Sequence, residues 1–372
     1  MARKVFFFLL YAMLLESCIP SNKTGKEHLF LLASSYSDGT TSGISIYDFN
    51  MQTGDYTCIS DIKQILNPSY LVVSQDEQMV YSVNETKEGG VSAFRFDKNR
   101  GVLSLVNSQS AEGGDPCYIN LDKGQNFILT ANYSGGNISV FPLDTDRSIK
   151  LLSMNILFDI PDSPASRIHT VVFSPDGKQL LATDLGKDKI YSFQVREEAK
   201  DSFLVLPPAN VIQLEAGSGP RHLAFHPNGN YLYCINELSG RITVFAYNGK
   251  EAEAIQSIAS DTTQTSDRKG SADIHLTSDG RFLYSSNRLK ADGIAIFSVD
   301  PENGRLTEIG YQSTGIHPRN FIISPNNKFL LCANLNTNNI QIFEIDAATG
   351  LLLDTGKEIS LDKPVCLKWI RR

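Results

Sequence analysis

The stretch of sequence that decides the fold runs from Pro220 to Asn236 and reads PRHLAFHPNGNYLYCIN. It contains a short apolar strand, a polar turn, a second apolar strand and a closing Asn. The same phrase recurs at residues 68–84, 116–132, 168–184, 271–287 and 318–334, and each closing Asn or Asp lies 47 to 52 residues from the next. Repeats of about 40–50 residues that hold short strands rich in β-branched and aromatic residues are typical of the blades of a β-propeller.

Each repeat continues with an alternating strand, such as GRITVF at residues 240–245, and with a fourth strand after an Asp-x-x-x-Gly turn such as Asp300–Gly304. Residues 29–33 and 43–49 look like second and third strands that lack a first strand, and residues 364–370 look like a first strand with nothing after it. We therefore predict an all-β, seven-bladed propeller over residues 28–372, with four antiparallel strands per blade. Strands from both termini would close the last blade, which leaves no exposed sheet edge at the junction.

Composition excludes some classes of function. The chain has 372 residues, a net charge of −7 and an apolar fraction of 41%. This apolar fraction can supply a substantial core, and there is no low-complexity tract of the kind that indicates disorder. Binding to nucleic acid requires a concentrated basic surface, which this sequence does not indicate. A small pocket for one anionic ligand remains compatible with this charge.

The N-terminus is typical of an exported protein. Arg3 and Lys4 precede an apolar segment, residues 5–15, which is short for a membrane span and suits the core of a signal peptide. It ends in Leu-Glu-Ser-Cys at residues 15–18, which resembles the lipobox of bacterial lipoproteins, with Cys18 as the acylated residue. We therefore expect a signal peptide at residues 1–17, a tether at residues 18–27, and a cell-envelope lipoprotein (periplasm or outer membrane) that meets the membrane through its lipid anchor only.

The remaining cysteines do not indicate a metal site. They are scattered, odd in number and form no CxxC pair: Cys58, Cys117, Cys234, Cys332 and Cys366. Neither zinc binding nor a full disulfide framework is predicted, although a single disulfide stays possible in an oxidising compartment.

The register of the repeats predicts two rings of side chains at one end of the propeller. The first two strands of a blade run in opposite directions, so the start of the first and the end of the second lie on the same face. The positions after each Pro and after each Asn are Ser69, Cys117, His169, Arg221, Ala272 and Arg319, and Glu85, Tyr133, Leu185, Glu237, Arg288 and Leu335. A histidine, a carboxylate and two guanidiniums at one mouth suit acid–base chemistry on an anionic substrate, so we predict that His169, Arg221, Glu237 and Arg288 are catalytic. Adjacent polar residues are predicted to bind the substrate: His222, Asn236, Asp273 and Asn287.

Structural explanations compete with these assignments. The charged residues could instead pair with one another and link adjacent blades. The Asn and Asp that close each repeat could cap loops, with a calcium site as a less favoured alternative. His222 and His226 have HxxxH spacing, but four residues of strand span ~13 Å, too far for a shared zinc ion. His275 is expected in the core or the channel wall, and no metal or cofactor is predicted.

The motifs resemble a known family. The segments GPRHLAFHPNGNYLYCINEL (219–238), ADIHLTSDGRFLYSSNR (272–288) and HPRNFIISPNNKFLLCAN (317–334) are similar to those of propeller-type 6-phosphogluconolactonases, to which the fungal carboxy-muconate lactonising enzymes are related. The resemblance covers residues 27–372. It implies an active site made of His169, Arg221, Glu237 and Arg288, the same four residues that the register selects.

The resemblance, together with these four residues, implies hydrolysis of a small sugar-type or anionic lactone. The resemblance implies a phosphorylated substrate, but the export signal argues against a cytosolic sugar phosphate. His169 would be the general base, Arg221 and Arg288 would hold the oxyanion or an acidic group, and Glu237 would orient an arginine or handle the leaving-group proton. The alternatives are a non-catalytic envelope propeller that binds a sugar acid or a protein, and a muconate-type cyclo-isomerase.

Overall fold

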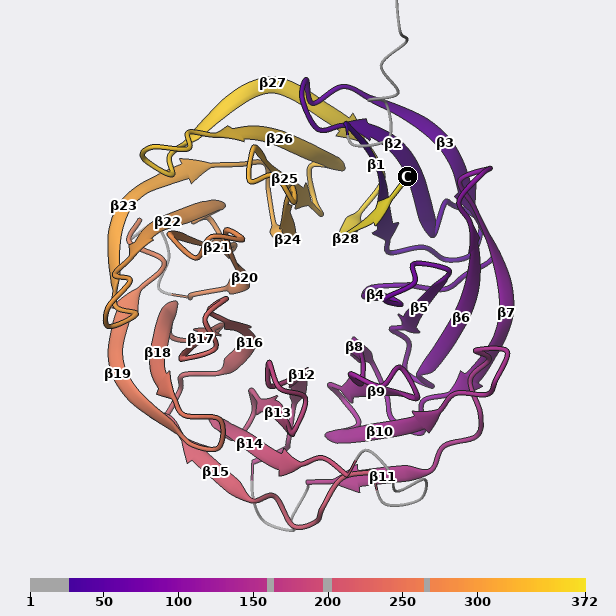
Figure 1. The fold of residues 1–372 in the computed structure, drawn as a ribbon, viewed down its shortest axis with the longest axis horizontal. Helices are drawn as coiled ribbons and strands as arrows, with labels where there is room; N and C mark the ends of the chain where they lie inside the picture. The colour runs from indigo at the N-terminus through magenta and orange to yellow at the C-terminus, as the bar shows by residue number, and fades with distance from the viewer. Residues whose placement is uncertain (1–26, 159–163, 197–202, 264–267) are drawn as a thin grey trace, which may run out of the picture.

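The computed structural model describes residues 27–158, 164–196, 203–263 and 268–372. Its strands form seven four-stranded antiparallel sheets, arranged as blades around one axis (Figure 1). The all-β propeller predicted from the repeats is confirmed. The predicted signal peptide, Cys18 and residues 18–26 of the tether lie outside the described residues. No helix within the described ranges is long and apolar enough to cross a membrane.

The blades follow one another along the chain, with the first-named strand of each nearest the axis. The first three blades are β28 (Pro364–Arg371), β1 (His28–Ser35), β2 (Ile44–Asn50) and β3 (Tyr56–Ile62); β4 (Leu71–Val73), β5 (Met79–Asn84), β6 (Gly90–Asp97) and β7 (Val102–Ser110); β8 (Pro116–Leu121), β9 (Phe127–Asn132), β10 (Asn137–Pro142) and β11 (Met154–Leu157). The next two are β12 (Ile168–Phe173), β13 (Gln179–Asp184), β14 (Lys189–Gln194) and β15 (Asn210–Gln213); β16 (Pro220–Phe225), β17 (Tyr231–Asn236), β18 (Arg241–Tyr247) and β19 (Ala252–Ala259). The last two are β20 (Ser271–Leu276), β21 (Phe282–Asn287), β22 (Gly293–Val299) and β23 (Leu306–Ser313); β24 (Pro318–Ile323), β25 (Phe329–Asn334), β26 (Asn339–Ile345) and β27 (Leu352–Ser360).

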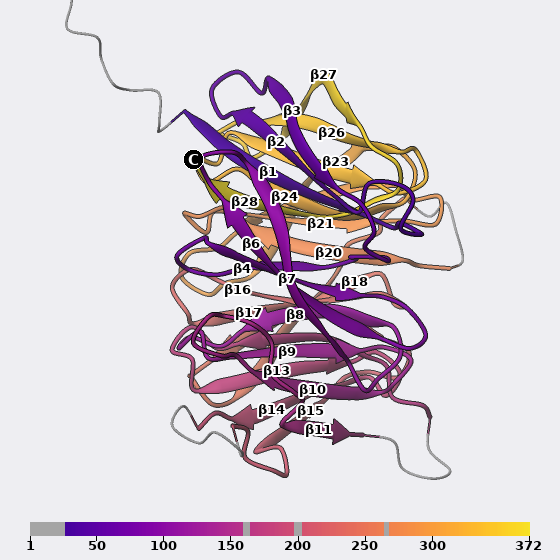
Figure 2. The same ribbon diagram turned by 90° about the vertical axis from the view of Figure 1, so that its right-hand side faces the viewer.

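The two ends of the chain share one blade, as predicted. The C-terminal strand β28 pairs antiparallel with β1 from Leu29–Arg371 to Ser35–Pro364, and the two strands lie side by side in both ribbon views (Figures 1 and 2). Trp369 extends the closure, since its indole Nε1 donates to the carbonyl of Ile323 in the neighbouring blade at 3.0 Å. The ring is therefore closed by backbone pairing and by a contact between blades.

Burial explains why the second strands read as continuous apolar runs. Both faces of a blade pack against other blades, so strands such as β9 and β25 are buried at every position. The outermost strands, β3 and β7 among them, are mostly exposed or half-buried. Apolar side chains of neighbouring blades form shared clusters; one of them joins Ile235 and Val244 to Ile274 and Phe297. The core is thus a ring of interfaces between blades.

Short polar turns connect the strands. In the Asp-x-x-x-Gly turn after β22, the backbone N–H of Gly304 donates to the carbonyl of Asp300 at 2.8 Å, and Gly304 has a φ of +71°. That backbone conformation favours glycine, and a Cβ atom there would lie 2.4 Å from the Tyr231 ring. Geometry therefore favours glycine at this position of the turn.

Candidate active site

A register shift in the innermost strands aims side chains at one mouth of the ring. In β16 the pairing shifts between Pro220 and His222, so that Arg221 has no partner opposite it. Equivalent shifts in β12 and β24 leave His169 and Arg319 without partners. A β-bulge bends its strand and re-aims the extra side chain. The bulges therefore bring residues of separate blades together at the axis.

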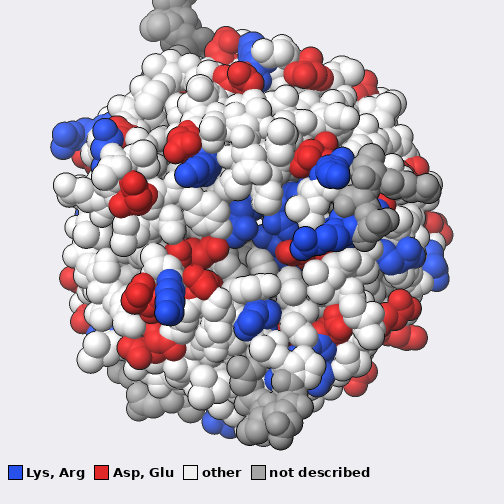
Figure 3. All heavy atoms as spheres, turned by 180° about the vertical axis from the view of Figure 1, so that it is seen from behind, with Lys and Arg blue, Asp and Glu red and all other residues white. Residues whose placement is uncertain are grey.

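The second ring of side chains is held by the ends of the second strands. The backbone N–H of Glu237 donates to Gly219 at 2.7 Å, and that of Arg288 donates to Gly270 at 3.2 Å. These bonds fix the start of each loop beside the neighbouring first strand. Figure 3 shows Lys and Arg side chains gathered in the central hollow of one face of the ring.

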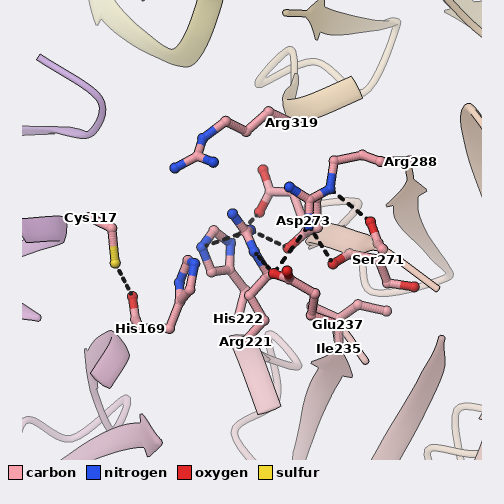
Figure 4. A network of polar contacts seen from close by, with 12 residues as sticks. Cys117, His169, Arg221, His222, Ile235, Glu237, Ser271, Asp273, Arg288 and Arg319 are labelled. Atoms are coloured by element: carbon pink, nitrogen blue, oxygen red, sulfur yellow. Dashed lines mark hydrogen bonds and ion pairs between the residues drawn. The ribbon is translucent and has the colours of Figure 1, made fainter. Parts of the chain in front are cut away.

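Glu237 bridges two buried arginines. Its Oε2 lies 2.9 Å from Nε of Arg221 and 3.1 Å from Nη2 of Arg288 (Figure 4). Burial alone would raise the pKa of Glu237, but the charges of Arg288 and Arg221 lower it below its usual value. Burial lowers the pKa of Arg288 to about 10, so this guanidinium stays charged near neutral pH. The predicted meeting of the two rings is confirmed, and the alternative of ion pairs that link blades is realised in the same three residues.

The imidazole ring of His169 lies beside this cluster without a hydrogen bond. Its side chain is 5% exposed, and neither ring nitrogen has a hydrogen-bond partner among the described residues. The ring makes edge contacts with His222 at 5.2 Å and with Tyr133 at 5.9 Å between centroids. Burial, followed by the charges of Arg221 and its neighbours, lowers the pKa of His169 well below its usual value. The imidazole is therefore neutral, with its proton-accepting nitrogen free.

A chain of hydrogen bonds links Arg221 to His222 and His222 to Asp273. Arg221 donates from Nη1 to Nε2 of His222 at 3.2 Å, and His222 donates from Nδ1 to Oδ1 of Asp273 at 2.8 Å. A guanidinium can only donate, so this pair of bonds assigns the proton of His222 to Nδ1. Burial, together with the charge of Arg221, lowers the pKa of His222 to about 4. Asp273 is 1% exposed. His222 thus contacts Arg221 directly and Asp273 reaches it only through His222, and the contact of both residues with substrate stays a prediction.

Asn236 and Asn287 lie inside their blades. Asn236 donates to Thr243 at 3.0 Å, and Asn287 accepts from Ser271 at 2.6 Å. Their side chains are 1% and 0% exposed. Asn236 also donates to the carbonyl of Arg241 across the following loop at 3.1 Å, which is the capping contact that the sequence offered as an alternative, and Asn287 donates to the carbonyl of Ser260 at 3.2 Å.

A second ionic group, absent from the predicted site, lies across the mouth. Arg319 donates from Nη2 to Glu85 at 3.2 Å, and the Tyr36 hydroxyl donates to the other oxygen of Glu85 at 2.8 Å. The Arg319 guanidinium also lies 5.3 Å from the centroid of the Tyr36 ring. Arg319 and Glu85 occupy the same ring positions as Arg221 and Glu237, so the register of the repeats could have predicted them as site residues. Tyr36 lies at neither ring position, so the register could not have predicted it.

His317 and Cys117 border this group, since Nε2 of His317 lies 3.4 Å from Nη1 of Arg288 and the Cys117 thiol donates to the carbonyl of His169 at 3.5 Å. His226 bonds Gly280 near the turn end of its strand at 3.2 Å, and His275 bonds Asp273 at 3.0 Å in the wall of the ring. In the described part of the chain, Cys58 is exposed and the other four cysteines are buried, and all five are free thiols. No group of three or more His, Cys, Asp or Glu side chains in the described ranges is arranged to hold a metal ion.

Comparison with known proteins places this chain in a family. Residues 30–369 match the family model described as "Lactonase, 7-bladed beta-propeller". The chain is 39% identical to a 6-phosphogluconolactonase of Formosa agariphila over 329 residues, which cover 86% of this chain and 92% of that protein. It is 34% identical to the 6-phosphogluconolactonase of Bacillus subtilis, over 91% of this chain and 97% of that protein.

Solved structures agree with the sequence relatives. A Bacteroides fragilis protein, described as a candidate 6-phosphogluconolactonase, is 47% identical with a TM-score of 0.88, over 93% of this chain and 99% of that chain. The periplasmic gluconolactonase of Pseudomonas aeruginosa is 29% identical with a TM-score of 0.87, over 92% of this chain and 99% of that chain. The chain therefore belongs to the seven-bladed β-propeller lactonase family.

Proposed function

We propose that this protein hydrolyses a sugar-type lactone to the open-chain acid. The observation that carries the proposal is a neutral His169 with free ring nitrogens beside two arginines bridged by Glu237, all at one mouth of a lactonase-family propeller. Ring opening needs an activated water, a stabilised oxyanion and a proton for the leaving oxygen. The three requirements can be assigned to these side chains.

In the first step a water molecule attacks the lactone carbonyl carbon, and His169 accepts the proton of that water. The carbonyl π electrons move to the oxygen, and the nearby guanidiniums stabilise the oxyanion. The low pKa of His169 suits a base that must be unprotonated, although it makes the free imidazole a weak one. The developing oxyanion offsets the positive charges that hold this pKa down, so proton acceptance becomes easier as the bond forms.

In the second step the tetrahedral intermediate collapses. The carbonyl re-forms, the bond to the ring oxygen breaks, and that oxygen takes the proton from His169. The acid then ionises and releases one proton. Glu237 is held as a carboxylate by its two arginines, so we assign it to orienting Arg221 and Arg288. Positioned electrostatic donors typically contribute about 3–4 kcal/mol each to lowering such a barrier.

Charge balance at the mouth favours a lactone whose negative charge arises only during the reaction. Three guanidiniums, those of Arg221, Arg288 and Arg319, face the carboxylates of Glu237 and Glu85. Among these five side chains one positive charge is left over, which matches a single oxyanion or product carboxylate. A substrate phosphate would add up to two further negative charges at neutral pH.

The test is a pH-stat assay of residues 28–372 with δ-gluconolactone and with its 6-phosphate, corrected for spontaneous hydrolysis. We expect proton release that saturates with substrate, and a higher kcat/KM for the unphosphorylated lactone. Arg221→Ala and His169→Ala should each lower kcat by at least about 100-fold. Variants with wild-type rates would remove the basis for these assignments.

We also propose that the protein is an exported lipoprotein of the cell envelope. The support is the sequence of residues 1–18, with its basic start, apolar core and Cys18. Acyl chains on Cys18 would hold the protein at a membrane. In cells fed labelled palmitate, the full-length protein should carry label in the membrane fraction, and Cys18→Ser should abolish that labelling. A labelled Cys18→Ser protein would contradict the proposal.

A further inference from the structure

Three arginines surround the mouth, but they differ in how many of their donors the protein already uses. Every guanidinium nitrogen of Arg288 is engaged: Nε by Gly270 at 2.7 Å, Nη1 by His317 at 3.4 Å and Nη2 by Glu237 at 3.1 Å. Arg288 is therefore the least able of the three to offer a new hydrogen bond without losing an existing one.

Arg221 is almost as fully committed. Its Nε donates to Glu237 at 2.9 Å, and its Nη1 donates both to the carbonyl of Ala272 at 2.5 Å and to His222. Only Nη2 lacks a partner among the described residues. The side chain is 2% exposed, and these bonds hold it on one side of the mouth.

Arg319 has the most donors to spare. Its Nη2 bonds Glu85, while Nε and Nη1 have no hydrogen-bond partner in the part of the chain that the structure describes. Its side chain is 16% exposed, more than those of Arg221 and Arg288. In Figure 4 its guanidinium points toward His169 and Arg221 from the opposite side of the mouth.

The support behind Arg319 fixes its direction. Glu85 accepts from Arg319 with one oxygen and from the Tyr36 hydroxyl with the other, and the Tyr36 ring lies under the guanidinium. Burial would lower the pKa of Arg319, but Tyr36 and Glu85 raise it above its usual value, so the charge is retained. The Arg319 guanidinium is thus held in place, charged, and left with free N–H donors. A preorganised oxyanion donor has these properties.

We propose that Arg319 is a catalytic residue that donates to the lactone carbonyl oxygen as it becomes an oxyanion, opposite His169. Arg221 and Arg288, bridged by Glu237, form the fixed wall beside it, and Glu85 is a positioning residue for Arg319. The assignment rests on the proposed lactonase function and goes beyond it, because it moves the main oxyanion contact from the predicted pair to a third arginine. Removing a side chain that stabilises charge only in the transition state should lower kcat and leave KM nearly unchanged.

The test measures kcat and KM of Arg319→Gln, Arg319→Lys and Glu85→Gln, with Arg100→Gln as the matched control. Arg100 is an exposed arginine in the outer turn between β6 and β7. We expect kcat to fall about 100- to 1000-fold in Arg319→Gln, since that is the typical effect of removing an oxyanion donor. Arg319→Lys should recover only part of this loss, because an ammonium cannot reproduce the planar donor pair. Glu85→Gln should lower kcat less than Arg319→Gln does, and the Arg100→Gln control should keep the wild-type kcat and KM.

A chemical rescue separates catalysis from a structural role. Added guanidinium ion at non-denaturing concentration should restore part of the kcat of Arg319→Ala and should leave the wild type unchanged. If Arg319→Gln does not fold, Arg319→Lys carries the test, because it keeps the charge opposite Glu85. A wild-type kcat in folded Arg319→Gln or Arg319→Lys, or a change confined to KM, would refute the assignment of Arg319 and leave the proposed lactonase function in place. A wild-type protein that opens no lactone would refute the proposed function and this assignment with it.

Discussion

Asp273→Asn should be among the most damaging single-atom changes in the protein. The Asp273 carboxylate lies between blades and accepts from His222 at 2.8 Å, from His275 at 3.0 Å and from the backbone of Phe321 at 3.3 Å. It also accepts from Asn320 Nδ2 at 2.5 Å. Asn320 accepts from the backbone of Leu367 at 2.8 Å, so the network reaches the closing strand β28.

An asparagine at position 273 keeps one acceptor oxygen and replaces the other with an amino group, which faces the N–H donors that the carboxylate accepted from. Whichever way the amide is oriented, at least one buried partner faces a donor in place of an acceptor. A buried donor that loses its acceptor typically costs about 1–3 kcal/mol, and hydrogen bonds to a charged group lie toward the upper end of that range. We expect a loss of that size, which is a large share of a total stability of about 5–15 kcal/mol.

The measurement is urea unfolding of wild type and variant, followed by circular dichroism. Asp144→Asn is the control, because Asp144 pairs with Lys150 at 3.5 Å at an exposed site and should cost less than about 1 kcal/mol. Burial would raise the pKa of Asp273, but His275 and His222 lower it well below its usual value. Its stabilising effect is thus complete above the unfolded pKa of about 4 and is lost as the pH falls through the lower folded value. The difference between wild type and Asp273→Asn should stay constant from pH 5 to 8, and a loss below about 1 kcal/mol would refute the reasoning.

Three further results are expected. The acid limb of kcat/KM should lie well below pH 6.5, because burial and Arg221 keep the pKa of His169 low and the base unprotonated; an acid limb at or above pH 6.5 would exclude His169 as the base. Deletion of residues 364–372 removes β28 and its pairing with β1, so the shortened chain should aggregate or lose its sharp thermal transition, whereas a monomeric, cooperatively melting product would disprove closure by the termini. Gly304→Ala should cost about 2–4 kcal/mol in urea unfolding, because it adds a Cβ at positive φ against the Tyr231 ring, and an unchanged midpoint would show that the turn relaxes freely.

Much of the candidate site could be predicted, because its residues recur at equivalent positions of a repeat. His169, Arg221 and Arg319 each come one place after the start of a first strand, and Glu237 and Arg288 come one place after the end of a second strand. Their contacts could not be predicted in the same way. Asn236 and Asn287 look like neighbours of the site along the chain, yet their side chains turn into the blade.

The sequence by itself determined the number of blades, the order of the strands and the closure by both termini. These features depend on local patterns, namely apolar strands, turn residues and a repeat of fixed length, which each segment carries alone. Only the tertiary structure decided which charges meet, which donors stay free and where Asp273 lies among its partners. Such contacts join residues about 50 positions apart in neighbouring blades, as between His222 and Asp273, and they depend on the bulges and on how one blade packs against the next, which no single repeat specifies.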